Sequence, residues 1–146
     1  MKRELLITRQ VEFASAHRLY RDELTEAKNY ELFGKCANPY GHGHNYFLEV
    51  TLKGEQDPET QMVVHFAQLK RILDELIVVP MDHRHLNYDV DFLKGLLPTS
   101  ENLVVVLWDR LVPAFTAANF HLNRLRLSSS ARNWVEYFGP TQVGES

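Results

Sequence analysis

Apolar and polar side chains alternate in two segments of the chain, which is the pattern of a β-strand with one buried face. The first segment runs from residue 5 to residue 13, with Arg9 as the polar exception on its apolar side. The second runs from residue 46 to residue 53 and ends before Gly54 and Asp57-Pro58, which favour a turn. The apolar positions of these two predicted strands are Leu5, Ile7, Val11, Phe13, Tyr46, Leu48, Val50 and Leu52.

Two later segments carry apolar side chains at the three-and-four spacing of an amphipathic helix. The first helix is expected over residues 66–77, with Pro80 marking its end. The second is expected to begin after Pro98, where Thr99 or Ser100 can cap it, and to end before Pro113. The buried stripes of the two helices are predicted to be Phe66, Leu69, Ile72, Leu73, Leu76 and Ile77, and Leu103, Val104, Leu107 and Leu111.

The C-terminal part of the chain is typical of a β-hairpin, with strands around Leu125 and Val135 and a turn near Ser128–Asn133. The predicted order is therefore strand, long loop, strand, helix, loop, helix, strand, strand. This order predicts an α+β fold, a four-stranded antiparallel sheet with two helices on one face. No repeat or linker divides residues 1–146, so we expect one domain. The two open edges of such a sheet favour pairing between subunits.

The composition of the 146 residues excludes several classes of protein. Hydrophobic residues make up 45% and charged residues 24%, as in ordinary globular proteins with a core. The net charge is −3 and no long basic field exists, so no nucleic-acid partner is expected. No apolar run reaches the roughly 20 residues of a membrane span, and no membrane partner is expected. The single cysteine, Cys36, cannot form an internal disulfide, which favours a cytoplasmic protein.

Three histidines near the predicted strands are candidate metal ligands. His42 and His44 lie in the run Gly41–Asn45, which leads directly into the second strand. Residues two apart on a strand point to the same face, about 6.5–7 Å apart at Cα, so these two imidazoles can chelate one ion. His17 follows the first strand and can supply a third ligand, and three neutral histidines suit Zn²⁺. The alternative is that His42 and His44 are turn residues beside flexible glycines.

Two further positions can carry chemistry. Cys36 lies in a loop with glycine, asparagine and proline, shortly before His42. A thiol beside a metal can act as base or nucleophile, but Cys36 can also be a fourth zinc ligand of a structural site, or a buried side chain without a role. Asp82 directly precedes His83, and a carboxylate bonded to an imidazole fixes its tautomer. The alternative for this pair, which the residues alone favour, is a polar surface loop.

Together, these and other motifs closely resemble those of the 6-pyruvoyl tetrahydropterin synthase family. The resemblance runs in order from about Glu12 to Gly139. The long loop between His17 and His42 is similar to that of animal-type synthases, whereas bacterial 6-carboxytetrahydropterin synthases typically have a shorter one. The matching motifs lie at residues 13–19, 33–36, 38–39, 41–46, 62–64, 82–87 and 98–102.

The resemblance implies the tunnelling fold, in which sheets from three subunits close into a barrel and two trimers stack into a hexamer. Active sites then lie at subunit interfaces. The implied activity is that of a carbon–oxygen lyase of tetrahydrobiopterin biosynthesis. It converts 7,8-dihydroneopterin triphosphate to 6-pyruvoyltetrahydropterin with elimination of triphosphate. The implied site residues are His17, His42 and His44 as zinc ligands, Cys36, Asp82 and His83 as catalytic residues, and Thr99, Ser100, Glu101 and Ser129 at the substrate.

Several positions depart from the family pattern: His65 stands where Asp or Asn is common, Gln61 where Gly is common, and the departure that bears on the substrate lies near the C-terminal hairpin. Ser129 and Ser130 stand where the family usually has a Glu-Thr pair, whose carboxylate anchors the pterin ring. Serine offers no charged acceptor, and hydrogen bonds to charged groups contribute about 1.5–3 kcal/mol. Three alternatives stay open: a 6-carboxytetrahydropterin synthase or related pterin side-chain lyase, a pterin- or purine-binding protein without turnover, and a structural zinc protein. Retention of Cys36, Asp82 and His83 favours the synthase.

Overall fold

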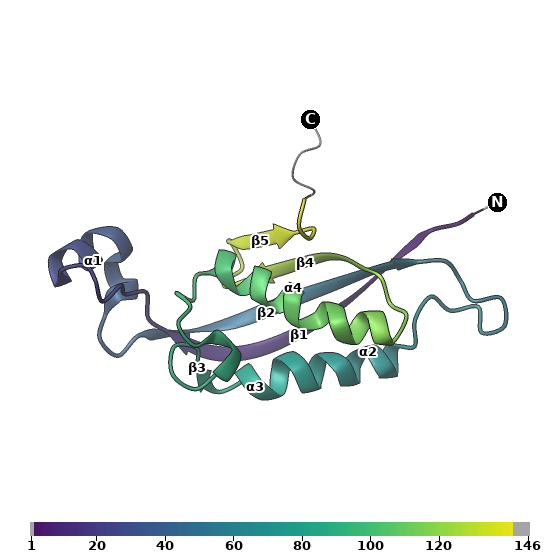
Figure 1. The fold of residues 1–146 in the computed structure, drawn as a ribbon, viewed down its shortest axis with the longest axis horizontal. Helices are drawn as coiled ribbons and strands as arrows, with labels where there is room; N and C mark the ends of the chain where they lie inside the picture. Colours follow the sequence, from purple (N-terminus) through teal and green to yellow (C-terminus); the bar gives the residue numbers. More distant parts are fainter. Residues whose placement is uncertain (1, 142–146) are drawn as a thin grey trace.

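The computed structural model describes residues 2–141, which form an α+β fold around one sheet (Figure 1). The sheet has five strands in the order β3-β1-β2-β4-β5. All neighbours pair antiparallel except β3, which runs parallel to β1. The strands are β1 (Leu5–His17), β2 (His42–Gly54), β3 (Arg84–His85), β4 (Leu122–Ser128) and β5 (Trp134–Tyr137).

The prediction of a four-stranded antiparallel sheet is wrong, because β3 adds a fifth strand that makes the sheet mixed. Its two residues pair with Ser15 and Ala16 of β1. A strand of two residues shows no alternation, so its side-chain pattern carries no signal that a sequence can be searched for. The other four strands, including the C-terminal hairpin, lie where the alternation predicts them.

The first predicted helix continues past the proline that was expected to end it. It comprises α2 (Phe66–Leu73), a π-helical stretch η2 (Asp74–Val78) and α3 (Val79–Met81), so Pro80 lies inside it. A proline inside a helix leaves the carbonyl four residues earlier without its N–H partner. That carbonyl belongs to Leu76, and it accepts a hydrogen bond from Arg110 Nε at 2.7 Å instead. The partner from another helix and the wider π-helical turn allow the segment to continue.

The second predicted helix, α4 (Ser100–Ala117), begins where expected, with the Thr99 hydroxyl accepting a hydrogen bond from Asn102 N. It also contains its proline, Pro113, rather than ending before it. The segment expected to be one long loop holds α1 (Glu26–Phe33) and the 3₁₀ turn η1 (Gly34–Ala37). A further 3₁₀ turn, η3 (Asp91–Leu93), precedes α4.

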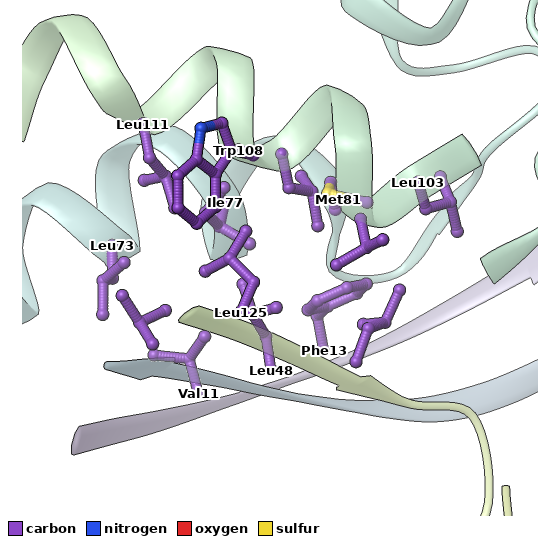
Figure 2. Packing of buried hydrophobic residues seen from close by; sticks show 14 of the residues in the cluster. Val11, Phe13, Leu48, Leu73, Ile77, Met81, Leu103, Trp108, Leu111 and Leu125 are labelled. Carbon is purple, nitrogen blue, oxygen red and sulfur yellow. The ribbon is translucent and has the colours of Figure 1, made fainter. Parts of the chain in front are cut away.

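The core lies between the α2–α3 segment, α4 and the face of the sheet that these helices cover (Figures 1 and 2). The predicted apolar positions of both long strands point into it except Leu5, which is 41% exposed at the open end of β1, and their fully buried members include Phe13 and Leu48. Ile77 and Leu103 meet them from the helices. Burial of such side chains stabilises the fold by about 1.5–3 kcal/mol each. No helix among residues 2–141 has the length and apolar character needed to cross a membrane.

The opposite face of the sheet is polar, and in the described part of the chain no helix packs on it (Figure 1). Arg124 on β4 reaches Glu49 on β2 at 3.4 Å and Glu136 on β5 at 3.1 Å. The Arg126 guanidinium lies 4.1 Å from the centre of the Trp134 ring. Within residues 2–141, the helices therefore shield one face of the sheet only.

Candidate metal centre and its surroundings

The register between β1 and β2 brings the three predicted metal ligands together. His17 at the end of β1 lies directly opposite His42 at the start of β2, and Ser15 lies opposite His44. Because His42 and His44 are two residues apart on one strand, both rings lie on the same face as His17. Their Nε2 atoms are 3.2 Å (His17–His42), 2.9 Å (His42–His44) and 3.2 Å (His17–His44) apart. We call these three residues the histidine triad.

The histidine triad fits a metal ion of tetrahedral preference. Zn–N bonds of about 2.0–2.1 Å place two ligand nitrogens about 3.3 Å apart, close to the distances observed. His17 Nδ1 lies 2.9 Å from the Pro98 carbonyl, and the His44 ring hydrogen-bonds the Ser129 backbone. A neutral imidazole that donates from Nδ1 carries a lone pair, not a proton, on Nε2. With Nδ1 donating to Pro98, His17 presents an Nε2 lone pair toward the other two rings, as a metal ligand must.

Burial favours the neutral form of His17 and His44, which is the form that binds a metal. The His17 side chain is buried, and this desolvation lowers its pKa from 6.5 to about 4. Desolvation also lowers the pKa of His44, followed by the charge of neighbouring His42. The two backbone carbonyls behind the rings orient them toward the ion, as outer-shell partners of metal ligands do.

Tyr46 is a neighbour of the histidine triad that was not predicted to be a site residue. It is fully buried, stacks on Phe13, and places its hydroxyl 3.5 Å from His17 Nδ1. Burial raises the pKa of this hydroxyl, so it stays protonated. The signal was available in the sequence, because Tyr46 continues the series 42, 44, 46 along one face of the strand.

Gly41 is required at the start of this arrangement. Its φ is +72°, and a Cβ built there would lie 2.5 Å from the His17 carbonyl oxygen. We expect Gly41→Ala to lower the free energy of unfolding by about 2–4 kcal/mol, from the left-handed backbone and from overpacking together. Chemical denaturation measures this change.

Gly34 provides the matched control for this prediction. Its φ is +57°, but a Cβ there would have no atom within 4 Å. Gly34 has a ψ of −132°, and Gly34→Ala should lose only the backbone contribution, about 1–3 kcal/mol. Equal losses in the two variants would show that the contact with His17 does not constrain Gly41.

Cys36 lies beside the histidine triad but not within it. Its Sγ is 3.8 Å from His42 Nε2, and the donor atoms that all lie within 4.8 Å of one another belong to the three histidines. The backbone of its loop is tied to the end of β1, because Leu19 N donates to the Cys36 carbonyl at 2.8 Å. The fold thus places a half-buried thiol at the edge of the metal centre.

Asp82 and His83 form a hydrogen-bonded pair rather than an unorganised surface loop. Asp82 Oδ2 lies 2.8 Å from His83 Nδ1, and Asp82 Oδ1 accepts from Ala14 N at 2.8 Å. The Ala14 N–H bond is the largest of the effects that lower the pKa of Asp82, so this carboxylate is ionised. His83 has a φ of +59°, and its side chain is 85% exposed. Within residues 2–141, no hydrogen bond connects the pair to Cys36 or to the histidine triad.

The four predicted substrate positions lie on two sides of the histidine triad. Thr99, Ser100 and Glu101 form the capped start of α4, directly after the Pro98 carbonyl that meets His17. Ser129 lies in the turn after β4, and its backbone meets the His44 ring. Among the described residues, a cavity of about 470 Å³ borders His44 on another side, and its lining includes His83 and His85.

The pH dependence of stability should reflect the buried histidine in the metal-free protein. Between pH 6.5 and about 4, the unfolded chain binds a proton at His17 that the folded chain does not. The stability that neutral His17 contributes is therefore complete above pH 6.5 and is lost as the pH falls toward 4. The lowered pKa values of His44 and His85 act in the same direction. Denaturation of wild type and His17→Asn across this range should show a shallower slope in the variant; identical slopes would contradict this assignment.

Comparison with known proteins agrees with this geometry over nearly the whole chain. The model of the 6-pyruvoyl tetrahydropterin synthase family matches residues 6–140. The Homo sapiens protein named 6-pyruvoyl tetrahydrobiopterin synthase is 46% identical over 133 residues, which cover 91% of this chain and 90% of that protein. The Poecilia reticulata protein of the same name is 41% identical, with 91% and 89% covered.

A solved structure shows the same fold. The structure of Caenorhabditis elegans 6-pyruvoyl tetrahydropterin synthase matches this one with a TM-score of 0.87 and 36% sequence identity. The match covers 95% of this chain and 98% of that one. The family match spans residues 6–140, which include the histidine triad, Cys36, Asp82 and His83. The chain therefore belongs to the 6-pyruvoyl tetrahydropterin synthase family.

Proposed function

We propose that the protein is a zinc-dependent 6-pyruvoyl tetrahydropterin synthase. It converts 7,8-dihydroneopterin triphosphate to 6-pyruvoyltetrahydropterin with loss of triphosphate. The observation that carries this proposal is the convergence of three histidine Nε2 atoms within 2.9–3.2 Å, with the Cys36 thiol 3.8 Å from one of them. The family membership supports the choice of substrate, and the donor set supports zinc.

The residues around the metal centre suit a reaction that moves protons on carbon and releases a phosphate chain. Bound zinc would act as a Lewis acid on the oxygens of the substrate side chain. Cys36 is placed to take a proton from a carbon of that side chain. His83, with Nδ1 bonded to ionised Asp82, leaves Nε2 exposed to give or accept a proton. Proton removal and loss of triphosphate complete the elimination. Further proton transfers move two hydrogens from the side chain to the ring, so the ring is reduced as the side chain is oxidised to two ketones and no external oxidant is needed.

Recognition of the pterin ring is assigned to the start of α4 and to the turn after β4. Thr99, Ser100 and Glu101 lie at a helix N-terminus, and Glu101 supplies a carboxylate that can accept from ring N–H groups. Ser129 supplies a hydroxyl and no charge. Glu101 is then the charged acceptor for the ring, and Ser129 contributes a neutral hydrogen bond.

We further propose that the complete site forms between subunits of a barrel-shaped trimer, two of which stack into a hexamer. The described residues share one core, which supports a single domain over residues 1–146. Both sheet edges are open: β3 has two residues, and β5 carries Trp134, which is 50% exposed, with Phe138 just beyond at 64%. The exposed His83, without a hydrogen bond to Cys36 in its own chain, is suited to complete a neighbour's site.

Mixing two inactive variants tests this assembly. Cys36→Ala and His83→Ala should each be inactive alone, but co-refolded mixtures should regain activity, because some interfaces then pair an intact Cys36 with an intact His83. Size-exclusion chromatography with light scattering checks that mixed oligomers form. A mixture that assembles and stays inactive would place both groups in one subunit.

The synthase activity is tested by incubating the zinc-loaded protein with 7,8-dihydroneopterin triphosphate and measuring triphosphate release and product mass together. A 6-pyruvoyl product released with triphosphate supports the proposal. A product with a shortened or carboxylated side chain would instead identify the related side-chain lyase. Zinc bound stoichiometrically without any turnover would overturn the proposal.

A further inference from the structure

The shorter of the two polar contacts of His17 Nδ1 is with a backbone carbonyl; the other, with the Tyr46 hydroxyl, is 3.5 Å. His17 Nδ1 lies 2.9 Å from the Pro98 oxygen, in a buried contact between residues that are far apart in the chain. A histidine that donates from Nδ1 keeps its Nε2 lone pair free, and the donor direction sets where that lone pair points. The direction of the Pro98 carbonyl therefore sets the direction of a proposed metal bond on the other side of the ring.

Pro98 is itself held in a tight turn that is tied to the start of α4. Thr99 N donates to the Leu97 carbonyl at 2.8 Å, across Pro98. Asn102 Nδ2 donates to the same Leu97 carbonyl at 2.9 Å, and Asn102 N donates to Thr99 Oγ1 at 3.1 Å. Asn102 thus links both ends of the turn to the first turn of the helix.

We propose that Asn102 is a positioning residue that holds the Leu97–Thr99 turn, aims the Pro98 carbonyl at His17, and so sets the affinity of the histidine triad for its metal. The turn leads directly into Ser100 and Glu101, the first residues of α4. If these two residues contact substrate, as the proposed function holds, metal and pterin strengthen each other's binding by the same factor. The effect on metal affinity rests on the geometry alone and needs no turnover.

Aspartate at this position separates positioning from ordinary helix capping. Asn102→Asp keeps the size of the side chain and adds a negative charge in the first turn of α4, where negative charge stabilises a helix. It replaces the N–H donor to Leu97 with a carboxylate oxygen, which repels the Leu97 carbonyl and so loosens the turn. The added charge would by itself attract a cation, so a loss of metal affinity cannot come from a direct effect of that charge on the ion.

The experiment measures zinc affinity by competition with a chromogenic chelator, and the thermal midpoint of the metal-free protein. For Asn102→Asp we expect the zinc Kd to rise about 10-fold, the lower end of the loss seen when an outer-shell partner is removed. The thermal midpoint should stay near that of wild type, because exposed substitutions rarely change stability by more than about 0.5 kcal/mol. The matched control is Asn123→Asp. Asn123 lies on β4, at the end of the sheet opposite to the histidine triad, and its replacement should change neither the zinc Kd nor the thermal midpoint.

Two results would overturn the proposal. One is wild-type zinc affinity in Asn102→Asp. The other is an affinity loss that only follows a lowered thermal midpoint, in Asn102→Asp and Asn102→Ala alike, which would make the residue purely structural. Binding of 7,8-dihydroneopterin with and without zinc measures the coupling in wild type and Asn102→Asp. If no variant binds this pterin, the assignment of the pterin ring to Ser100 and Glu101 is wrong, while the zinc measurement still decides the role of Asn102.

Discussion

Replacing His44 with glutamine is expected to lower zinc affinity by more than about 100-fold and to abolish turnover. Loss of an outer-shell partner alone lowers metal affinity by about 10–100-fold. His44 is itself a candidate ligand, with Nε2 2.9 Å from His42 Nε2 and 3.2 Å from His17 Nε2. Removing the metal with a chelator should have the same effect on activity and be reversed by adding zinc. The fold should persist, because His44 is only half-buried and lies at the end of the sheet.

Zinc stoichiometry after dialysis and the Kd from chelator competition provide the measurements. His65→Gln is the matched control, because His65 is an exposed histidine at the start of α2 that makes no side-chain capping bond. It should bind zinc like wild type. Full zinc occupancy with unchanged affinity in His44→Gln would show that the converging imidazoles are not the metal site.

Replacing Cys36 with alanine should lower kcat/KM by about 10²–10⁴-fold while zinc stays bound. This range is what a positioned proton-transfer group contributes. Zinc is expected to stay because Cys36 Sγ lies outside the group of three mutually close donor atoms. The loss of activity would then come from the missing thiol rather than from a missing metal.

Zinc content and single-turnover rates of the same Cys36→Ala preparation distinguish the possible roles of this cysteine. Zinc released together with activity would indicate a closed structural Cys-His site. Unchanged activity with bound zinc would exclude Cys36 from the chemistry altogether. Cys36→Ser serves as the conservative comparison, because its hydroxyl is nearly isosteric but a far weaker base near neutral pH.

The local elements were predictable because each is specified by neighbouring side chains. The alternation along β1 and β2 places Phe13 and Leu48 in the core, and the Thr99 cap marks the start of α4. The prediction that helices end at Pro80 and before Pro113 is wrong, because both prolines lie inside helical segments. Whether a proline ends a helix depends on whether the carbonyl four residues earlier finds another hydrogen-bond donor. The Leu76 carbonyl finds one in Arg110, a residue of another helix.

The candidate site was predictable to a similar extent. His42 and His44 share a face because of the period of a strand, and this follows from spacing alone. That His17 lies opposite His42, rather than one residue out of step, depends on the pairing register of the two strands. A shift of one residue would have pointed His17 to the other face of the sheet and dispersed the three imidazoles.

The sequence by itself determined the secondary structure of the main elements, the identity of the candidate ligands and the family resemblance, because these depend on residue types at short spacings. The tertiary structure decided the pairing of β3 with β1, the convergence of the three Nε2 atoms, and the backbone groups of Pro98 and Ser129 behind two of the rings. Backbone carbonyls are present at every residue, so no side-chain pattern marks the ones that orient His17 and His44. Only the folded arrangement of distant segments selects them.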